Sequence, residues 1–209
     1  MKIQIDIWSD YICPFCFIGK KRLQNVINQF NEEHSLEVRY RSFQLDPAAE
    51  GSRMDTKRFA QEHGMTVYEL EKAREHVIEM AKDVGLDLHF DTFINANTFD
   101  SHRLGHYAAT KGKDGELTER LMRASLSESL NIADRKVLVS LAGDVGLDGA
   151  AEMLKSDAYS DQVIADLKES KSLNITGVPF FVFNNKYTVS GAQSEQVFLN
   201  LINKILEEG

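Results

Sequence analysis

The chain has 209 residues, and its 32 acidic residues outnumber its 24 lysines and arginines, which gives a formal charge of -8 at pH 7. This balance argues against nucleic-acid binding, which needs clustered Lys and Arg. No run approaches the roughly 20 apolar residues of a membrane span. Asp6 and Asp10 interrupt the apolar run that a secretory signal needs. We therefore expect a cytoplasmic protein without nucleic-acid or membrane partners, and the length favours one domain that carries an insertion.

The first 43 residues predict a strand, a helix and a second strand. Isoleucines alternate with other residues from Ile3 to Trp8, which is typical of a strand. From Phe15 onward the apolar residues recur every three or four positions, which is the period of a helix. A second alternating run begins at Leu36 and extends to about Phe43. This β-α-β order favours a parallel pair of strands with a right-handed crossover.

The middle of the chain has a different pattern. Between residues 47 and 156 the apolar residues follow a helical period, with stripes at residues 70–84, 98–110, 115–130 and 134–145. We therefore expect this whole part to be helical.

The last fifty residues return to mixed structure. A helix at about 158–173 precedes the apolar run 180–183, and Asn184-Asn185 then suits the turn of a hairpin whose second strand is 186–190. A closing helix carries an apolar stripe from 197 to 206. The sequence thus predicts a discontinuous domain formed by residues 1–46 and 157–209, into which the helical residues 47–156 are inserted.

The only two cysteines, Cys13 and Cys16, lie where the first strand gives way to the first helix. A thiolate at a helix N-terminus is stabilised by unpaired backbone N–H groups and by the helix dipole, so Cys13 should be the nucleophile. Cys16, one turn further in, should be more buried and able to displace whatever Cys13 captures. Pro14 suits the first turn because its missing N–H costs nothing there.

The cysteine pair could instead bind a metal ion or be part of the hydrophobic core. His102 and His106 share a face of a predicted helix and could complete a zinc site with Cys13 and Cys16, although the spacing is not that of a zinc finger. The pair could also be two structural thiols, because free cysteine is often a small buried residue. The cysteine spacing alone does not decide between these roles and redox chemistry.

Four segments together resemble the DsbA family of thioredoxin-fold proteins, and in particular its cytoplasmic FrnE-like branch: DYICPFCFIGK (10–20), NTFDSHR (97–103), GVPFF (177–181) and SGAQ (190–193). The resemblance implies an α/β protein with a thioredoxin-like fold and a large, all-helical insertion. It also implies a cis peptide bond between Val178 and Pro179 that faces the cysteines, with the backbone around Gly177 and Val178 free to pair with a substrate chain.

The same resemblance implies a thiol-disulfide oxidoreductase that acts on protein thiols and disulfides or on small thiols. It needs no metal and no cofactor beyond its own redox-active disulfide, and its oligomeric state stays open. A sister branch, the kappa-class glutathione transferases and the 2-hydroxychromene-2-carboxylate isomerases, has serine in place of Cys13. That difference favours disulfide chemistry, although glutathione could still be a co-substrate.

Four further residues are weaker candidates. Asp6 could accept the proton of Cys16, or could be a strand residue that reaches solvent. His102 and Arg103 could line the active-site cleft, or could form an ordinary surface pair on their helix. Phe15, between the cysteines, should be exposed and could contact hydrophobic substrates.

Overall fold

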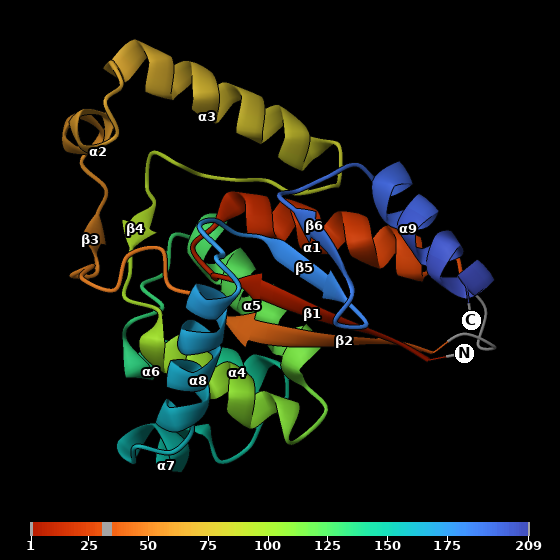
Figure 1. Cartoon of the computed structure of the whole chain (residues 1–209). Coiled ribbons are helices and arrows are strands. Elements are labelled where there is room, and N and C mark those ends of the chain that lie inside the picture. The colour runs from red at the N-terminus through yellow and green to blue at the C-terminus, as the bar shows by residue number, and fades with distance from the viewer. Residues whose placement is uncertain (1, 31–34, 209) are drawn as a thin grey trace.

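A computed structural model describes residues 2–30 and 35–208. Its main sheet has four strands in the order β2-β1-β5-β6 (Figure 1). These strands are β1 (Lys2–Ser9), β2 (Ser35–Ser42), β5 (Phe180–Phe183) and β6 (Tyr187–Ser190). β1 pairs in parallel with β2 and antiparallel with β5, so the predicted β-α-β opening is confirmed.

The two faces of β1 are covered by different helices. Ile3, Ile5 and Ile7 pack with residues of α1 (Pro14–Ile27) and α9 (Glu195–Glu208) in one apolar cluster. Side chains alternate along a strand, so Trp8 points to the opposite face, where its indole N–H donates to a carbonyl of α8 (Ser160–Ser172), 3.2 Å away. The sheet therefore lies between an α1–α9 layer and α8.

The hairpin between β5 and β6 forms as predicted. Asn184 and Asn185 both have positive φ angles, 49° and 53°, and the N–H of Lys186 donates to the carbonyl of Phe183 over 2.9 Å. This is the turn that matches the twist of two antiparallel strands, and asparagine tolerates its left-handed backbone.

The insertion contains six helices among the described residues: α2 (Thr56–Glu62), α3 (Val67–Lys82), α4 (Phe99–Ala109), α5 (Asp114–Leu126), α6 (Arg135–Asp144) and α7 (Ala150–Lys155). The expectation that it is entirely helical was wrong, because β3 (Ser52–Arg53) pairs antiparallel with β4 (Ile94–Asn95). Strands of two residues are too short to leave an alternating pattern in the sequence.

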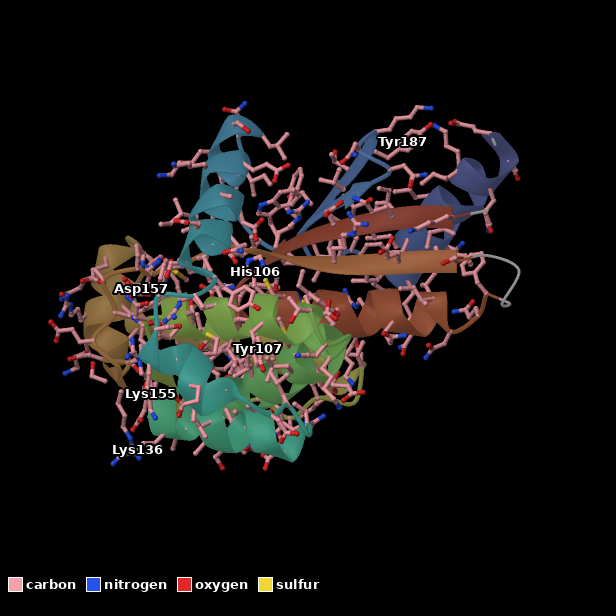
Figure 2. The ribbon with its side chains drawn as sticks, turned by 90° about the horizontal axis from the view of Figure 1, so that it is seen from below. His106, Tyr107, Lys136, Lys155, Asp157 and Tyr187 are labelled. Atoms are coloured by element: carbon pink, nitrogen blue, oxygen red, sulfur yellow. The ribbon has the colours of Figure 1, made fainter. Side chains whose placement is uncertain are left out.

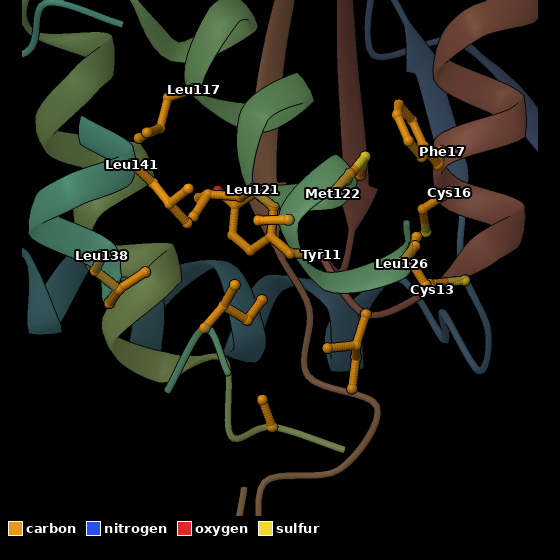
Figure 3. Packing of buried hydrophobic residues seen from close by; sticks show 14 of the residues in the cluster. Tyr11, Cys13, Cys16, Phe17, Leu117, Leu121, Met122, Leu126, Leu138 and Leu141 are labelled. Carbon is orange, nitrogen blue, oxygen red and sulfur yellow. The ribbon is translucent and has the colours of Figure 1, made fainter. Parts of the chain in front are cut away.

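The insertion packs directly onto the segment that carries the cysteines. Figure 3 shows Tyr11, Cys13, Cys16 and Phe17 in one apolar cluster with leucines of α5 and α6. Lys20 of α1 also pairs with Glu119 of α5 at 2.7 Å, and Lys21 pairs with the same carboxylate. None of the helices in residues 2–30 and 35–208 is long and apolar enough to cross a membrane.

Candidate active site

Cys13 is the N-cap of α1. Its backbone is extended, with φ -93° and ψ 114°, and its carbonyl accepts hydrogen bonds from the N–H groups of Cys16 (3.1 Å) and Phe17 (3.3 Å). Pro14 begins the helix, so the first helical turn is fixed where the strand ends. The geometry places the Cys13 thiol at the positive end of the α1 dipole.

The Cys13 thiol meets the turn before β5. Its Sγ lies 3.6 Å from the carbonyl oxygen of Val178, to which it donates, and the Val178–Pro179 peptide bond is cis. Gly19 makes this approach of α1 to the turn possible, since a Cβ at that position would lie 3.1 Å from Cγ of Pro179. The structure thus brings together the two proline-containing motifs that are 165 residues apart.

The second thiol, Cys16, lies beneath the first. Burial raises the pKa of Cys16 well above its ordinary value, and its contact with the Cys13 thiol raises that pKa further. Both side chains are buried, with 4% of Cys13 and 2% of Cys16 exposed. Cys16 is therefore more buried than Cys13, as expected, but the difference between them is small. Phe15 between them is 40% exposed, as expected, and Gly177 is exposed beside the half-buried Val178.

Comparison with known proteins identifies the family of the chain. The family model described as DSBA-like thioredoxin domain matches residues 4–203. The chain belongs to this family. The structure of a probable DsbA oxidoreductase from Streptomyces coelicolor is 32% identical, with a TM-score of 0.89 over 99% of this chain and 91% of that one.

Two more distant matches extend the comparison. The uncharacterized protein YwbO of Bacillus subtilis (strain 168) is 29% identical over 97% of both chains. A 2-hydroxychromene-2-carboxylate isomerase is 13% identical, with a TM-score of 0.72 over 98% of this chain and 97% of that one, and this likeness shows the fold alone. Membership of the family supports an oxidoreductase or isomerase activity for this DsbA-like protein.

Asp10 is a site residue of the DsbA-like chain that the sequence did not single out. Its side chain is fully buried, its Oδ2 accepts the N–H of Leu45 at 2.7 Å, and its carbonyl accepts the N–H of Cys13 at 3.2 Å. Asp10 thereby ties the loop before Cys13 to the segment that follows β2. Asp10 is the first residue of the family-like segment 10–20, but its partner at Leu45 could not be seen in the sequence.

His102 is buried and turned toward the same segment. It is 3% exposed, its Nε2 lies 2.8 Å from the carbonyl of Phe43 and 3.5 Å from Oδ1 of Asp10, and its ring packs against Tyr11 with centroids 4.7 Å apart. It is therefore not a surface residue. Its contacts with Asp10 and Tyr11 support the loop that precedes the cysteines.

Arg103 does not face the cysteines. It is 2% exposed and donates to the carbonyl of Ala158 at 2.9 Å, to Asp100 at 2.6 Å and to the carbonyl of Ser156. These contacts join α4 to the connection between α7 and α8. Both expectations for Arg103, a cleft residue or a surface residue, are corrected by this burial.

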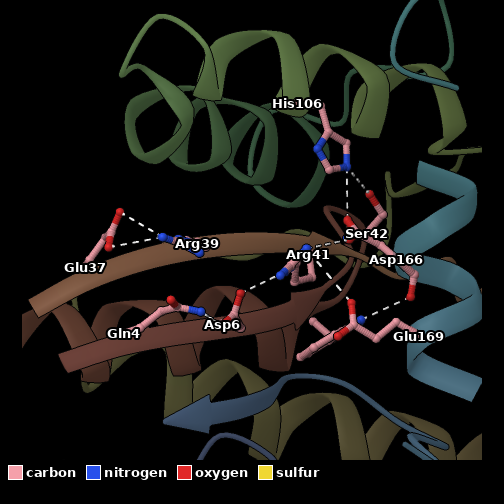
Figure 4. A network of polar contacts seen from close by, with 10 residues as sticks. Gln4, Asp6, Glu37, Arg39, Arg41, Ser42, His106, Asp166 and Glu169 are labelled. Atoms are coloured by element: carbon pink, nitrogen blue, oxygen red, sulfur yellow. Dashed lines mark hydrogen bonds and ion pairs between the residues drawn. The ribbon is translucent and has the colours of Figure 1, made fainter. Parts of the chain in front are cut away.

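Asp6 is not brought to Cys16. The side chain of Asp6 is 2% exposed, and its Oδ1 accepts from Nε of Arg41 at 2.8 Å (Figure 4). It lies on the face of β1 opposite to the isoleucines that contact α1, because it alternates with them along the strand. This placement argues against its expected role as proton acceptor, and equally against an Asp6 that reaches solvent.

The predicted histidines and cysteines do not assemble into a metal site. Nε2 of His106 lies 3.0 Å from Oδ2 of Asp166 and 3.1 Å from the hydroxyl of Ser42, so His106 contacts these two residues and not the cysteines. In the part of the chain that the structure describes, no group of three or more potential ligands is placed to hold a metal ion.

The buried carboxylate of Asp166 should contribute to the pH dependence of stability. Burial by itself raises its pKa, but hydrogen bonds from His106 and from the backbone N–H of Ser42 outweigh burial and hold the pKa below its ordinary value of 3.8. A depressed pKa stabilises the fold above pH 3.8, and this contribution is lost as the pH falls through the lower pKa of the folded state.

We expect Asp166→Asn to lower the free energy of unfolding at pH 7 by about 2 kcal/mol, because charged hydrogen bonds to Arg41 and His106 are weakened. Urea denaturation between about pH 3 and pH 7 should show the difference from the wild type shrinking at the acid end. Asp161→Asn, an exposed change on the same helix, is the matched control. A difference that stayed constant with pH would contradict this assignment.

Proposed function

We propose that this protein is a thiol-disulfide oxidoreductase in which Cys13 is the nucleophile and Cys16 the resolving thiol. The observation that carries the proposal is the position of Cys13, which caps α1, contacts Val178 and lies against Cys16. Buried structural thiols would not require one sulfur at a helix N-terminus and in contact with a backbone carbonyl of the turn before β5. Family membership agrees with the proposal.

The reaction balances without a further cofactor. The Cys13 thiolate attacks one sulfur of a substrate disulfide, which forms a mixed disulfide and releases one substrate thiolate that takes up a proton. Cys16 then loses its proton and attacks Sγ of Cys13. This second exchange releases the other substrate thiol and leaves a Cys13–Cys16 disulfide, so two electrons have passed to the substrate. A small thiol such as glutathione would regenerate the reduced pair.

The raised pKa of Cys16 has a consequence for the order of these steps. At neutral pH a buried thiol with a raised pKa stays protonated and does not compete with Cys13 for the substrate. Cys16 becomes effective only when the mixed disulfide places a sulfur next to it. We therefore propose that burial of Cys16 suppresses premature attack and that resolution is the slower step at low pH.

The four family-like segments also indicate the branch of the family and the kind of substrate. We propose a FrnE-like member that works in the cytoplasm on protein disulfides or small disulfides, with Val178 and Gly177 offering backbone to an extended substrate. Phe15, the exposed residue between the cysteines, would contact apolar substrate side chains. The direction of the reaction in the cell depends on its reduction potential and on its partners.

The glutathione-dependent isomerase or transferase is the alternative that the fold also allows. No feature of this site favours it, since the chain has Cys13 where those enzymes have serine, and the structural likeness to the isomerase shows the fold alone.

The test compares three properties of the purified wild-type protein. We expect it to accelerate the reduction of insulin disulfides by glutathione, to show no glutathione conjugation of an electrophilic aromatic substrate, and to contain no stoichiometric zinc by elemental analysis. Conjugation without disulfide exchange would instead establish the alternative, and stoichiometric zinc with inert thiols would establish a metal-binding module.

A further inference from the structure

Ser9, the last residue of β1, contacts the buried thiol of Cys16. It alternates along the strand with the isoleucines that pack against α1, so its side chain lies on the face of the sheet that α1 covers. This side chain is buried. The hydroxyl of Ser9 donates a hydrogen bond to Sγ of Cys16, and the backbone N–H of Asp10 donates another. Two neighbouring donors therefore converge on the sulfur that the proposed mechanism assigns to the second exchange.

The two donors are held in place by the segment that follows β2. The N–H of Phe43 donates to the carbonyl of Ser9 at 3.2 Å, and the N–H of Leu45 donates to Oδ2 of Asp10 at 2.7 Å. The carbonyl of Asp10 in turn accepts the N–H of Cys13 at 3.2 Å. The donors are thus aimed before any charge forms on the sulfur, and donors that need no reordering stabilise a buried charge most effectively.

The side chains near β1 that could act as a base have other partners. Asp6, on the opposite face of β1, accepts from Nε of Arg41 at 2.8 Å. The Nε2 of His102 lies 2.8 Å from the carbonyl oxygen of Phe43. These contacts leave hydrogen bonding, rather than a neighbouring base, as the means of stabilising the Cys16 thiolate.

The serine opposite Ser9 on the next strand also has a different partner. Ser42 of β2 is in register with Ser9, but its hydroxyl lies 3.1 Å from Nε2 of His106, which Figure 2 shows where α4 faces the sheet. His106 lies 3.0 Å from Oδ2 of Asp166 as well. Of these two serines at the same level of the sheet, Ser9 is the one that contacts Cys16.

The second exchange needs the thiolate of Cys16, which burial disfavours. Burial raises the pKa of Cys16 and the adjacent Cys13 thiol raises it further, whereas the hydrogen bonds from Asp10 and Ser9 lower that pKa. A serine hydroxyl keeps its proton at neutral pH, so Ser9 acts as a hydrogen-bond donor. A hydrogen bond to a charged acceptor is stronger than one to a neutral acceptor, so Ser9 favours the thiolate over the thiol.

We propose that Ser9 is a catalytic residue of the second exchange, in which its hydroxyl and the N–H of Asp10 hold the negative charge on Sγ of Cys16 during attack on the mixed disulfide. This inference rests on the proposed function, since it requires Cys16 as the resolving thiol. In this step the bond between Cys13 and the substrate sulfur breaks and the Cys13–Cys16 bond forms. The proton lost by Cys16 ends on the departing substrate thiolate, and Ser9 gives up no proton.

The test follows both exchanges in one reaction. Reduced protein is mixed in a stopped-flow instrument with dithiobis(nitrobenzoate), which releases one coloured thiolate in each exchange. The rate of the first phase, capture by Cys13, varies with the reagent concentration, and the rate of the second phase, resolution by Cys16, does not. We expect Ser9→Ala to leave the first phase unchanged and to slow the second about fivefold at pH 7, because a thiolate that loses a donor is less abundant although more nucleophilic.

Two variants separate the hydroxyl from general effects on the core. Ser9→Thr keeps the hydroxyl, so its second phase should match that of the wild type. Ser125→Ala is the matched control, because Ser125 of α5 is fully buried and its hydroxyl makes no hydrogen bond within the described part of the chain. Both phases should be unchanged in Ser125→Ala, and equal slowing in this variant and in Ser9→Ala would overturn the inference.

A titration measures the same effect without redox activity. Cys13→Ser leaves Cys16 as the single thiol of the chain, so the ultraviolet absorbance of the thiolate reports Cys16 alone. Adding Ser9→Ala should shift this titration to higher pH, because the thiolate loses one of its two donors. An unchanged titration, or an unchanged second phase in Ser9→Ala, would overturn the role of Ser9 and leave the proposed function intact. The absence of a second phase in the wild type would overturn the proposed function itself, and the role of Ser9 with it.

Discussion

Replacing Cys13 with serine is expected to lower the rate of disulfide exchange by at least about a thousandfold, because a serine hydroxyl is not ionised at neutral pH and is a poor nucleophile toward sulfur. The comparison is made by steady-state reduction of insulin at equal protein concentration. Thermal stability should barely change, since oxygen replaces sulfur in a small side chain whose hydrogen bond to the carbonyl of Val178 is long, at 3.6 Å.

Cys16→Ser is the matched control for this prediction. It should also abolish multiple turnover, but it leaves the first exchange at Cys13 intact, so a stoichiometric release of one substrate thiol should remain. If Cys13→Ser kept wild-type turnover, the assignment of Cys13 as nucleophile would be wrong.

The second large effect is expected for Arg103→Met. This side chain is 2% exposed and donates to Asp100 and to the carbonyls of Ser156 and Ala158, so its replacement removes a buried charge together with three hydrogen bonds that join α4 to the connection between α7 and α8. We expect the free energy of unfolding to fall by about 3 kcal/mol. For a chain of this length, such a change corresponds to a decrease in Tm of about 6 to 12 °C.

Arg135 provides a matched control because it pairs with the same carboxylate, Asp100, at 2.7 Å, yet its side chain is 57% exposed. Arg135→Met should cost less than about 1 kcal/mol, as exposed ion pairs usually do. At room temperature both variants should keep the kcat/KM of the wild type for insulin reduction. A selective loss of kcat/KM in Arg103→Met, without a loss of stability, would instead support the substrate-binding role that the sequence suggested.

Local patterns were sufficient to predict most of the fold. The change from alternating residues to a three-and-four spacing between Ile7 and Leu23 marks the end of β1 and the course of α1, since each period reflects one buried face. The twin asparagines predicted the hairpin for a similar reason, because their backbone preference is local. The family and the thioredoxin-like fold with its insertion are confirmed by the comparisons.

Contacts between distant residues could not be predicted in the same way. Asp6 was expected to act on Cys16, but its partner is Arg41, 35 positions away and on another strand. Arg103 was grouped with a motif, whereas its carbonyl partners lie more than 50 positions further along the chain. Asp10 was missed because its buried contact to Leu45 depends on how the loop before Cys13 meets the end of β2. No local period reports such pairs.

In the proposed mechanism, Cys13 captures the substrate and Cys16 releases it. The most direct measurement incubates Cys16→Ser with oxidised glutathione or insulin and identifies the adducts by mass spectrometry of the intact protein and of its peptides. We predict that one stable mixed disulfide accumulates at Cys13, and that Cys13→Ser under the same conditions forms none at Cys16. An adduct that forms at Cys16 as readily as at Cys13, or at neither, would contradict this mechanism.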